Sequence, residues 1–476
     1  MATKQKSKQG YADVVIGLQY GDEGKARVVD VMANDYDIVA RFNGGANAGH
    51  TIETKDGGKV ALNQVPSAIF YPKKTLYIGS GCVVNIEKLA AEIQKLEAIK
   101  IKLKGRLHVS CLCSVVQPHQ ILLDAQIGKV IGTTKNGIGP CYADKAIRMN
   151  GKSLVNIRLG DLLENPKKYF ANILENLKAY EEFQKVRVEN PDNYVKNIEK
   201  AFAKIKDYIQ LDTLFMEKQA AKGARILFEG AQSVMLDINK GSVPYVTSSN
   251  TVAGAAFVGG DLSANYHRKT IGIAKAIMSR VGNGPFTSEF GGKKSEEYCA
   301  ATLDGGAPKY AKAVELKYDI KKLLKSKDGF DVGKAIRVMS AEYGTVTTRP
   351  RRVGMFDLVQ LNYAIRMNGV SELIINKCDL LNVYAGTAEG KIPLVVGYKL
   401  DGKKIDYVPG AVDAYERVKP VIVKKTAFKE DVSKVRQFSK LPAALREVAK
   451  LIEKSANCKI VGMGVGAERT QYVSIK

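Results

Sequence analysis

The sequence predicts a large α/β protein whose ligand-binding loops follow its strands. Short β-branched runs, such as residues 14–16, alternate with segments of helical periodicity. Glycine-rich loops follow several of these runs, as they do at the carboxyl ends of strands in α/β proteins. The chain has 476 residues, of which 45% are hydrophobic. This length suits two or three ordinary domains or one large unit with insertions.

Composition excludes several classes of protein. No apolar run approaches the roughly 18 residues of a membrane span, and the basic segment 1–12 lacks the apolar region of a secretory signal. Seven irregularly spaced cysteines favour a reducing compartment over a disulfide framework. The net charge is +24, but the lysines are dispersed and we expect no nucleic-acid function. We predict a flexible N-terminus, 1–12, followed by one large domain, 13–476.

The first strand leads into a glycine-rich turn and then into a helix. Gly21 and Gly24 flank Asp22, and Lys25 follows where the helix begins. Glycine lets the backbone approach a ligand, and free amides at a helix start favour phosphate. Asp22 would repel phosphate unless a cation bridges them or the carboxylate acts as a base on another substrate. The spacing differs from GxxxxGK[ST], and an ordinary turn with solvated charges is the alternative.

Further loops add candidate ligand-binding residues. His50 lies in a turn of small residues, GGANAGHT, so we expect it near a ligand, although a histidine bonded to backbone is the alternative. A loop over 131–148 offers Thr134, and Arg148 follows on the next helix. Residues 159–222 show helical periodicity with a break at Asn190-Pro191, which predicts a helical insertion or lid.

The later loops indicate recognition of anions and of guanine. Arg349, Arg351 and Arg352 offer forked donors for carboxylate or phosphate, and an ordinary basic loop is the alternative. After the strand in SELIINKCDLL, the carboxylate of Asp379 can accept from N1–H and N2–H₂ of guanine, a pair of donors that adenine lacks. The stem of Lys377 can cover the ring. With the phosphate turn, these features predict a GTP-dependent enzyme with an anionic second substrate.

From about residue 14 to residue 469 the chain resembles the adenylosuccinate synthetase family. The shared motifs are GDEGK (21–25), NAGHT (47–51), IGTT…GIGP (131–140), FEGAQ (228–232), VTSSNT (246–251), GPF (284–286), TRPRR (348–352) and NKCD (376–379). The resemblance implies a P-loop-like domain with a central, mostly parallel β-sheet flanked by helices and helical insertions. It also implies a cytoplasmic homodimer without membrane attachment. The implied reaction joins IMP and L-aspartate at the expense of GTP through 6-phosphoryl-IMP, with one Mg²⁺ per subunit. Its products are N6-(1,2-dicarboxyethyl)-AMP, GDP and phosphate, in the AMP branch of purine biosynthesis.

The resemblance also assigns roles to residues. Asp22 would be the base for N1–H and a Mg²⁺ ligand, His50 the acid near O6, and the carbonyl of Gly49 a second Mg²⁺ ligand. GTP would contact Gly21, Asp22, Glu23, Gly24, Lys25, Ala26, Arg27, Gly49, His50, Thr51, Arg351, Lys377, Cys378, Asp379, Gly464, Val465 and Gly466. IMP would contact Asp22, Lys25, Asn47, His50, Thr134, Gln232, Thr247, Arg349 and, from the neighbouring subunit, Arg148. Aspartate would contact Thr345, Val346, Thr347, Thr348, Arg349 and Arg351.

Several positions depart from the usual pattern of the family. The departures are Tyr20 and Met355 for tryptophans, Ala26 and Thr348 for glycines, Arg27 for lysine, Asn136 for arginine, Val346 for threonine and Thr287 for proline. Because several of them fall on the amino-acid side, a paralogue that uses another purine monophosphate or amino acid is one alternative. A related phage branch aminates a guanine nucleotide, but it usually replaces the base carboxylate, so Asp22 argues against that substrate. A GTP- or RNA-binding pseudoenzyme is a further alternative, against which the retained Asp22 and His50 argue.

Overall fold

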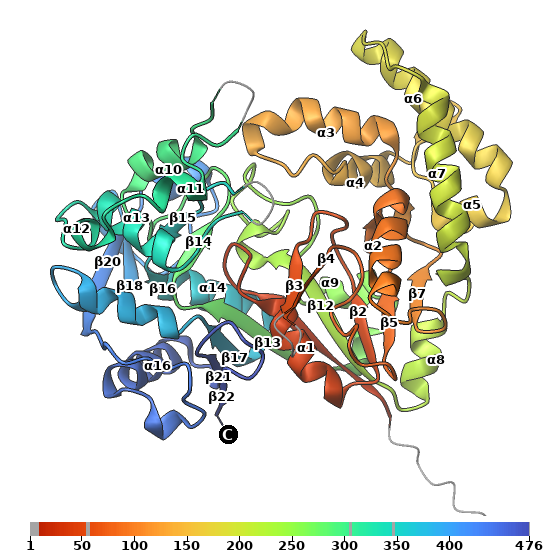
Figure 1. Cartoon of the computed structure of the whole chain (residues 1–476). Helices are drawn as coiled ribbons and strands as arrows, with labels where there is room; N and C mark the ends of the chain where they lie inside the picture. Colours follow the sequence, from red (N-terminus) through yellow and green to blue (C-terminus); the bar gives the residue numbers. More distant parts are fainter. Residues whose placement is uncertain (1–8, 54–57, 304–306, 345–347, 476) are drawn as a thin grey trace, which may run out of the picture. The chain divides into compact units, whose positions relative to one another are not determined.

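The computed structural model describes residues 9–475 apart from 54–57, 304–306 and 345–347 (Figure 1). The chain divides into two compact units. The first comprises the described residues up to Ile16 with Lys25–Gln232 and Thr247–Lys269, and the second comprises Gly17–Gly24, Ser233–Val246 and the described residues from Thr270 onward. The sequence predicts one domain and shows no boundary, because each unit is assembled from separate stretches of chain.

Each unit contains strands of a mostly parallel sheet. The first unit holds, in spatial order, β11 (Ile209–Gln210), β7 (Leu107–Ser110), β5 (Thr75–Ile78), β2 (Ile38–Arg41), β12 (Arg225–Ser233) and β1 (Tyr11–Gly17). The pairs from β11 through β12 are parallel. Every residue of β2 is buried, as expected where helices cover both faces of a parallel sheet.

The second unit continues the same type of architecture. It holds β13 (His267–Lys275, of which residues 270–275 belong to this unit), β17 (Val370–Asn376), β21 (Lys459–Gly464) and β22 (Tyr472–Ser474) in this order. The strands β13, β17 and β21 are parallel, and β22 is antiparallel to β21. The predicted α/β class with a mostly parallel central sheet flanked by helices is therefore confirmed.

Smaller sheets complete the strand inventory. The first unit adds β3 (His50–Glu53), β4 (Lys59–Leu62), β6 (Val83–Val84), β8 (Ser114–Val115), β9 (Met149–Asn150) and β10 (Ser153–Leu154). The second adds β14 (Met278–Arg280), β15 (Arg352–Gly354), β16 (Phe356–Asp357), β18 (Lys391–Leu400), β19 (Lys403–Ile405) and β20 (Lys419–Thr426). The last four form a sheet in which β18 pairs with β16, β19 and β20.

Some of the helices begin at a side-chain cap. In the first unit, α2 (Ile86–Ala98) is capped by the side chain of Asn85, which accepts from the amide of Lys88. The other helices of this unit are α1 (Lys25–Met32), α3 (Pro118–Ile131), α4 (Ile138–Ile147) and α9 (Ala255–Gly259), besides those of the insertion described below. Those of the second are α10 (Gly292–Ala300), α11 (Lys312–Glu315), α12 (Ile320–Leu324), α13 (Gly329–Met339), α14 (Leu358–Asn368), α15 (Val412–Glu416) and α16 (Ala443–Ala456).

Residues 159–222 form the predicted helical insertion, with one correction. They contain α5 (Leu159–Glu164), α6 (Pro166–Gln184), α7 (Pro191–Ile205) and α8 (Phe215–Ala221). The predicted break is present, because α7 begins at Pro191, and α6 and α7 pack side by side (Figure 1). However, residues 209–210 are strand β11, which pairs with β7. A strand of two residues leaves no periodicity in the sequence that could reveal it.

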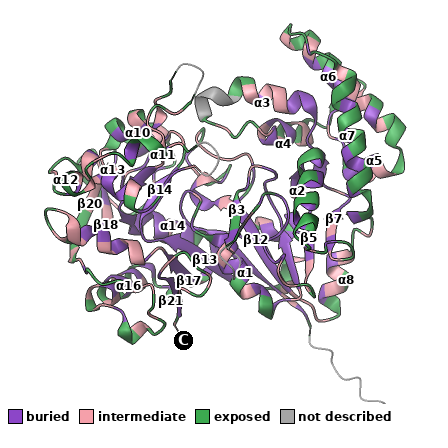
Figure 2. Ribbon diagram, in the orientation of Figure 1, coloured by how far each residue is buried: buried purple, intermediate pink, exposed green. Residues whose placement is uncertain are grey.

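Burial follows the central sheet. Figure 2 shows buried residues along the strands, whereas α6 and α7 carry many exposed positions. The first strand begins at Tyr11, so Tyr11 and Ala12 belong to β1 rather than to the predicted N-terminal segment. The guanidinium of Arg268 lies over the Tyr11 ring, 3.6 Å from its centroid. Among the described residues, no helix combines the length and apolarity that a membrane crossing requires.

Candidate active site

The glycine-rich turn, the guanine loop and the C-terminal glycine loop come together within the second unit. The side-chain amide of Asn376 donates to the carbonyl of Glu23 at 2.6 Å, and the amide of Cys378 donates to the carbonyl of Gly464 at 2.9 Å. A Cβ at Gly24 would lie 2.9 Å from the Asn376 side chain, and one at Gly464 would lie 2.5 Å from it. A Cβ at either position would force the Asn376 side chain to shift, and Gly24 also has a φ of +83°. Because β17 and β21 are parallel neighbours, their carboxyl ends present these loops on one edge.

The backbone of the glycine-rich turn is held in an unusual conformation. Asp22 has a φ of +59° and Gly21 a φ of +92°, both in the left-handed region. The carboxylate of Glu23 is buried and accepts from the amide of Gly21 at 2.9 Å and from the hydroxyl of Ser233 at 2.6 Å. The Glu23 side chain therefore supports the turn, whereas the Asp22 side chain is 39% exposed and open to a ligand.

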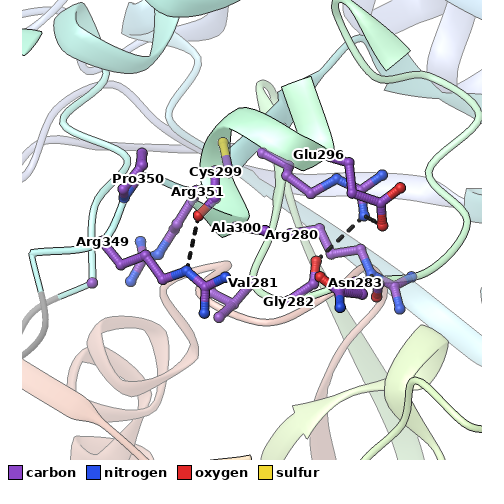
Figure 3. A pocket seen from close by; sticks show the side chains of 12 residues that line it. Arg280, Val281, Gly282, Asn283, Glu296, Cys299, Ala300, Arg349, Pro350 and Arg351 are labelled. Atoms are coloured by element: carbon purple, nitrogen blue, oxygen red, sulfur yellow. Dashed lines mark hydrogen bonds and ion pairs between the residues drawn. The ribbon is translucent and has the colours of Figure 1, made fainter. Parts of the chain in front are cut away.

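An arginine-lined pocket lies in the same unit. Arg280, Arg349, Arg351 and Arg352 are among its lining residues (Figure 3). Arg280 is held by backbone carbonyls and Arg352 by two glutamates, so both have structural partners. Arg349 donates through Nε to the carbonyl of Cys299 at 2.9 Å. Arg351 pairs with Asp22, with 2.9 Å between Nη2 and Oδ2.

The structure describes only some of the residues predicted to bind the substrate L-aspartate. Arg349 and Arg351 line the pocket, whereas Thr345, Val346 and Thr347 lie outside the described residues. Thr348 has a φ of +53°. A β-branched residue in the left-handed region is strained, which gives a physical reason why the family usually has glycine at this position.

In the first unit, His50 lies against a buried carboxylate that the sequence analysis missed. His50 is the first residue of β3 rather than part of the predicted turn, and it is buried. Its Nδ1 lies 2.5 Å from Oε1 of Glu229 on β12, an ion-pair contact without the alignment of a good hydrogen bond. The amide of Ser67 also donates to Glu229 at 2.8 Å. A glutamate inside the apolar strand motif FEGAQ was the available signal.

Burial and charge oppose each other at this pair. Burial lowers the pKa of His50 from its ordinary value, and the Glu229 carboxylate opposes that shift. Burial alone would raise the pKa of Glu229, but the charges of His50 and Arg41 and the hydroxyl of Ser67 lower it to about 2. Glu229 is therefore an anion at neutral pH, and it stabilises the protonated imidazole.

In the first unit, residues that are predicted to bind IMP lie around Gly44. A Cβ on Gly44 would lie 3.2 Å from the side-chain oxygen of Gln232 and 3.4 Å from that of Asn47. Asn43 accepts from the amide of Ala231 and donates to the hydroxyl of Ser249. These bonds hold the segment that contains Thr247 beside the end of β12.

The loop that carries Thr134 reaches the same region. The side chain of Asn136 donates to the hydroxyl of Thr134 at 3.1 Å and to the carbonyl of Ala46 at 3.5 Å. Arg148 caps the end of α4 and is exposed, so its side chain is available to a partner.

The donors for a metal ion are sparse. No cluster of three or more histidine, cysteine, aspartate or glutamate side chains suited to a metal occurs among the described residues. Mg²⁺ that is bound together with substrate phosphates needs only one or two protein ligands. The exposed carboxylate of Asp22, on a turn suited to phosphate, fits such a site.

Comparisons with known proteins agree with this geometry. The family model "Adenylosuccinate synthetase" matches residues 14–473. Adenylosuccinate synthetase 2 of Cupriavidus pinatubonensis is 44% identical over 98% of this chain and 97% of its own length. The adenylosuccinate synthetase of Lactobacillus gasseri is 37% identical over 98% of both chains.

Solved structures show the same likeness. The fully ligated adenylosuccinate synthetase from Plasmodium falciparum has a TM-score of 0.82 at 30% identity and covers 98% of this chain and 100% of that one. The succinoaminodeoxyadenylate synthetase of cyanophage S-2L shares the fold alone, with a TM-score of 0.59 at 16% identity over 98% and 96% of the two chains. This chain belongs to the adenylosuccinate synthetase family.

Proposed function

We propose that this chain catalyses the GTP-dependent ligation of L-aspartate to IMP, the reaction that defines its family. The products are N6-(1,2-dicarboxyethyl)-AMP, GDP and phosphate. The observation that carries the proposal is the meeting of the GDEGK turn with the loops at 376–379 and 464–466 in the second unit. This arrangement suits GTP, because a phosphate turn lies beside a carboxylate that can read guanine.

Asp22 and His50 are suited to the transfer of phosphate to the base. As O6 of IMP attacks the γ-phosphorus, the bond from that phosphorus to the β,γ-bridging oxygen breaks and GDP leaves. The carboxylate of Asp22 would take the N1 proton, since it is exposed on its turn. His50, held by Glu229, would donate a hydrogen bond to O6 as charge develops there.

The arginine pocket is suited to the amino-acid substrate. L-Aspartate carries carboxylates, and arginine binds carboxylate through two parallel hydrogen bonds. Arg349 and Arg351 would hold it, with its amine directed at C6 of the phosphorylated base. The amine forms the new C–N bond, phosphate leaves with O6, and the amine loses a proton.

Mg²⁺ and a second subunit complete the proposal. The carboxylate of Asp22 and the carbonyl of Gly49 would hold the ion, which when bound neutralises phosphate charge. Exposed Arg148 would reach IMP of the partner subunit in a homodimer. The seven cysteines, all within the described residues, are free and buried, which supports a cytoplasmic location.

The test is turnover of the purified protein with IMP, GTP, Mg²⁺ and L-aspartate, followed by the ultraviolet spectrum of the purine. We expect product from the wild type, and at least a 100-fold lower rate from Asp22→Asn, since general-base catalysis contributes about 10²–10⁴-fold. GTP binding without turnover would instead favour a paralogue with another acceptor or amine. Salt-sensitive RNA binding without turnover would favour the pseudoenzyme.

A further inference from the structure

Glu342 is a buried anion at the centre of a cationic cluster in the second unit. Its side chain is completely buried. Oε1 pairs with the ammonium of Lys377. Oε2 accepts from Nη1 of Arg351 at 3.1 Å and from the hydroxyl of Ser279 at 2.7 Å.

A second arm runs from Glu342 to the glycine-rich turn. The ammonium of Lys275 lies 2.6 Å from the hydroxyl of Ser279 and donates to the carbonyl of Gly21 at 2.9 Å. Lys275 is itself fully buried, and burial lowers its pKa. Glu342 is therefore connected to the backbone of the turn through Ser279 and the ammonium of Lys275.

Arg351 provides a second connection between Glu342 and the turn. Its Nη1 faces Glu342 while its Nη2 pairs with Asp22, the residue that follows Gly21 in the chain. Two chains of contacts thus connect Glu342 to the turn. One reaches Gly21 through Ser279 and Lys275, and the other reaches Asp22 through Arg351. Because these residues have positive φ angles, the turn depends on tertiary contacts to keep its shape.

Stability alone does not account for this cluster. A buried set of charges often stabilises a fold no better than apolar side chains of similar volume would. Here two of the cations are also the residues that face the proposed ligand. Lys377 belongs to the guanine loop, and Arg351 lines the pocket and holds the proposed base. The carboxylate of Glu342 therefore fixes the positions of both side chains.

We propose that Glu342 is a positioning residue that couples guanine recognition to the catalytic turn. It fixes the ammonium of Lys377 and the guanidinium of Arg351 on two oxygens of one carboxylate. The guanine end and the phosphate end of GTP are thereby read at a fixed separation. This inference rests on the proposed use of GTP and adds a residue that does not itself touch the substrates.

The test compares GTP affinity, measured by calorimetry with Mg²⁺, in the wild type, Glu342→Gln and Glu342→Asp. We expect Glu342→Gln to bind GTP about 10- to 100-fold more weakly, because hydrogen bonds to charged groups are lost and the cations repel. Glu342→Asp keeps the charge and should restore part of the affinity. The KM for IMP should stay within about threefold, whereas a loss of folded protein would lower kcat without raising the Kd of GTP.

A double-mutant cycle with Lys377→Met sharpens the test. If Glu342 acts through Lys377, the loss of GTP affinity in the double variant will be smaller than the product of the single losses. Asp357→Asn, at another fully buried carboxylate of this unit, is the matched control and should leave GTP affinity unchanged. Should Glu342→Gln fail to fold, Glu342→Asp must by itself weaken GTP binding more than twofold, and a Kd within twofold of the wild type would overturn the positioning role.

The outcomes separate the two proposals. GTP affinity within twofold of the wild type in both Glu342 variants, or full additivity with Lys377→Met, would overturn the positioning role. A wild type that binds GTP but makes no product would overturn the proposed reaction and leave the role of Glu342 standing. A wild type that does not bind GTP would overturn both.

Discussion

Replacing Glu229 by glutamine tests whether a buried charge sets the proton affinity of His50. The substitution keeps the size of the side chain and removes its charge. Nδ1 of His50 and Oε1 of Glu229 are 2.5 Å apart and both residues are buried, so solvent screens their attraction little. At an effective dielectric constant of about 20, two unit charges about 4 Å apart attract by about 4 kcal/mol, so loss of the anion lowers the pKa of His50 further.

The sign of the effect follows from the two opposing terms at His50. Burial lowers its pKa and Glu229 opposes that shift, so Glu229→Gln leaves burial unopposed. If the imidazolium donates to O6, the active form will then be lost at a lower pH as pH rises. We expect kcat at neutral pH to fall by about 100- to 1,000-fold, with the alkaline limb displaced to lower pH. The KM for GTP should change less than threefold.

The assay is the initial rate between pH 5.5 and 8.5, followed by the purine absorbance. Glu92→Gln is the matched control, because Glu92 is a buried carboxylate of the same unit that accepts from backbone amides rather than from His50. It should lower stability without lowering the rate of folded enzyme. A kcat for Glu229→Gln within threefold of the wild type, with an unchanged pH profile, would refute the reasoning.

Other predictions concern specificity and stability. Asp379→Asn should lower kcat/KM for GTP by at least about 100-fold and improve the use of XTP, because the new amide can donate to O2 of xanthine; unchanged nucleotide preference would contradict guanine reading. Glu315→Gln leaves the buried Arg337 without its anion and should lower the free energy of unfolding by about 3–5 kcal/mol in urea; a loss under 1 kcal/mol would contradict this. Burial raises the pKa of Asp357 to about 6, so the native state binds the extra proton and stability falls as pH rises from 4.5 to 7. Asp357→Asn should lose about 2 kcal/mol less over that range, and equal pH slopes would show that Asp357 titrates normally.

The sequence predicted those parts of the site that are encoded locally. The turn at 21–25 and the loop at 376–379 each follow a strand, and their glycine and carboxylate spacing carries the chemistry within a few residues. The parallel arrangement of β17 and β21 then brings the loops at their ends together. Local pattern and sheet topology therefore place these loops together, while their predicted ligand contacts stay a prediction.

The sequence could not reveal the residues that act through tertiary contacts. Glu229 lies far along the chain from His50, and Glu342 pairs with Lys377, which is 35 residues away. No periodicity in the sequence marks either pairing. His50 likewise lies in strand β3, paired with β4, whereas local composition predicted a turn of small residues. The division into two units was hidden for the same reason, since short stretches such as residues 17–24 join the unit that they contact.

The departures from the family pattern can now be ordered by where they lie. Tyr20 and Met355 belong to one buried cluster of the second unit. Tyr20 donates to the carbonyl of Pro285 at 3.3 Å, and the guanidinium of the pocket residue Arg280 stacks on its ring at 4.6 Å. Both of these expected departures therefore lie in one buried cluster that contacts the pocket residue Arg280, which favours a packing role over a new substrate. Thr348 differs from them, since its strained backbone adjoins the two arginines proposed to bind aspartate. If this chain and its relatives differ in the amino-acid substrate that they accept, we expect Thr348 to be the first position responsible.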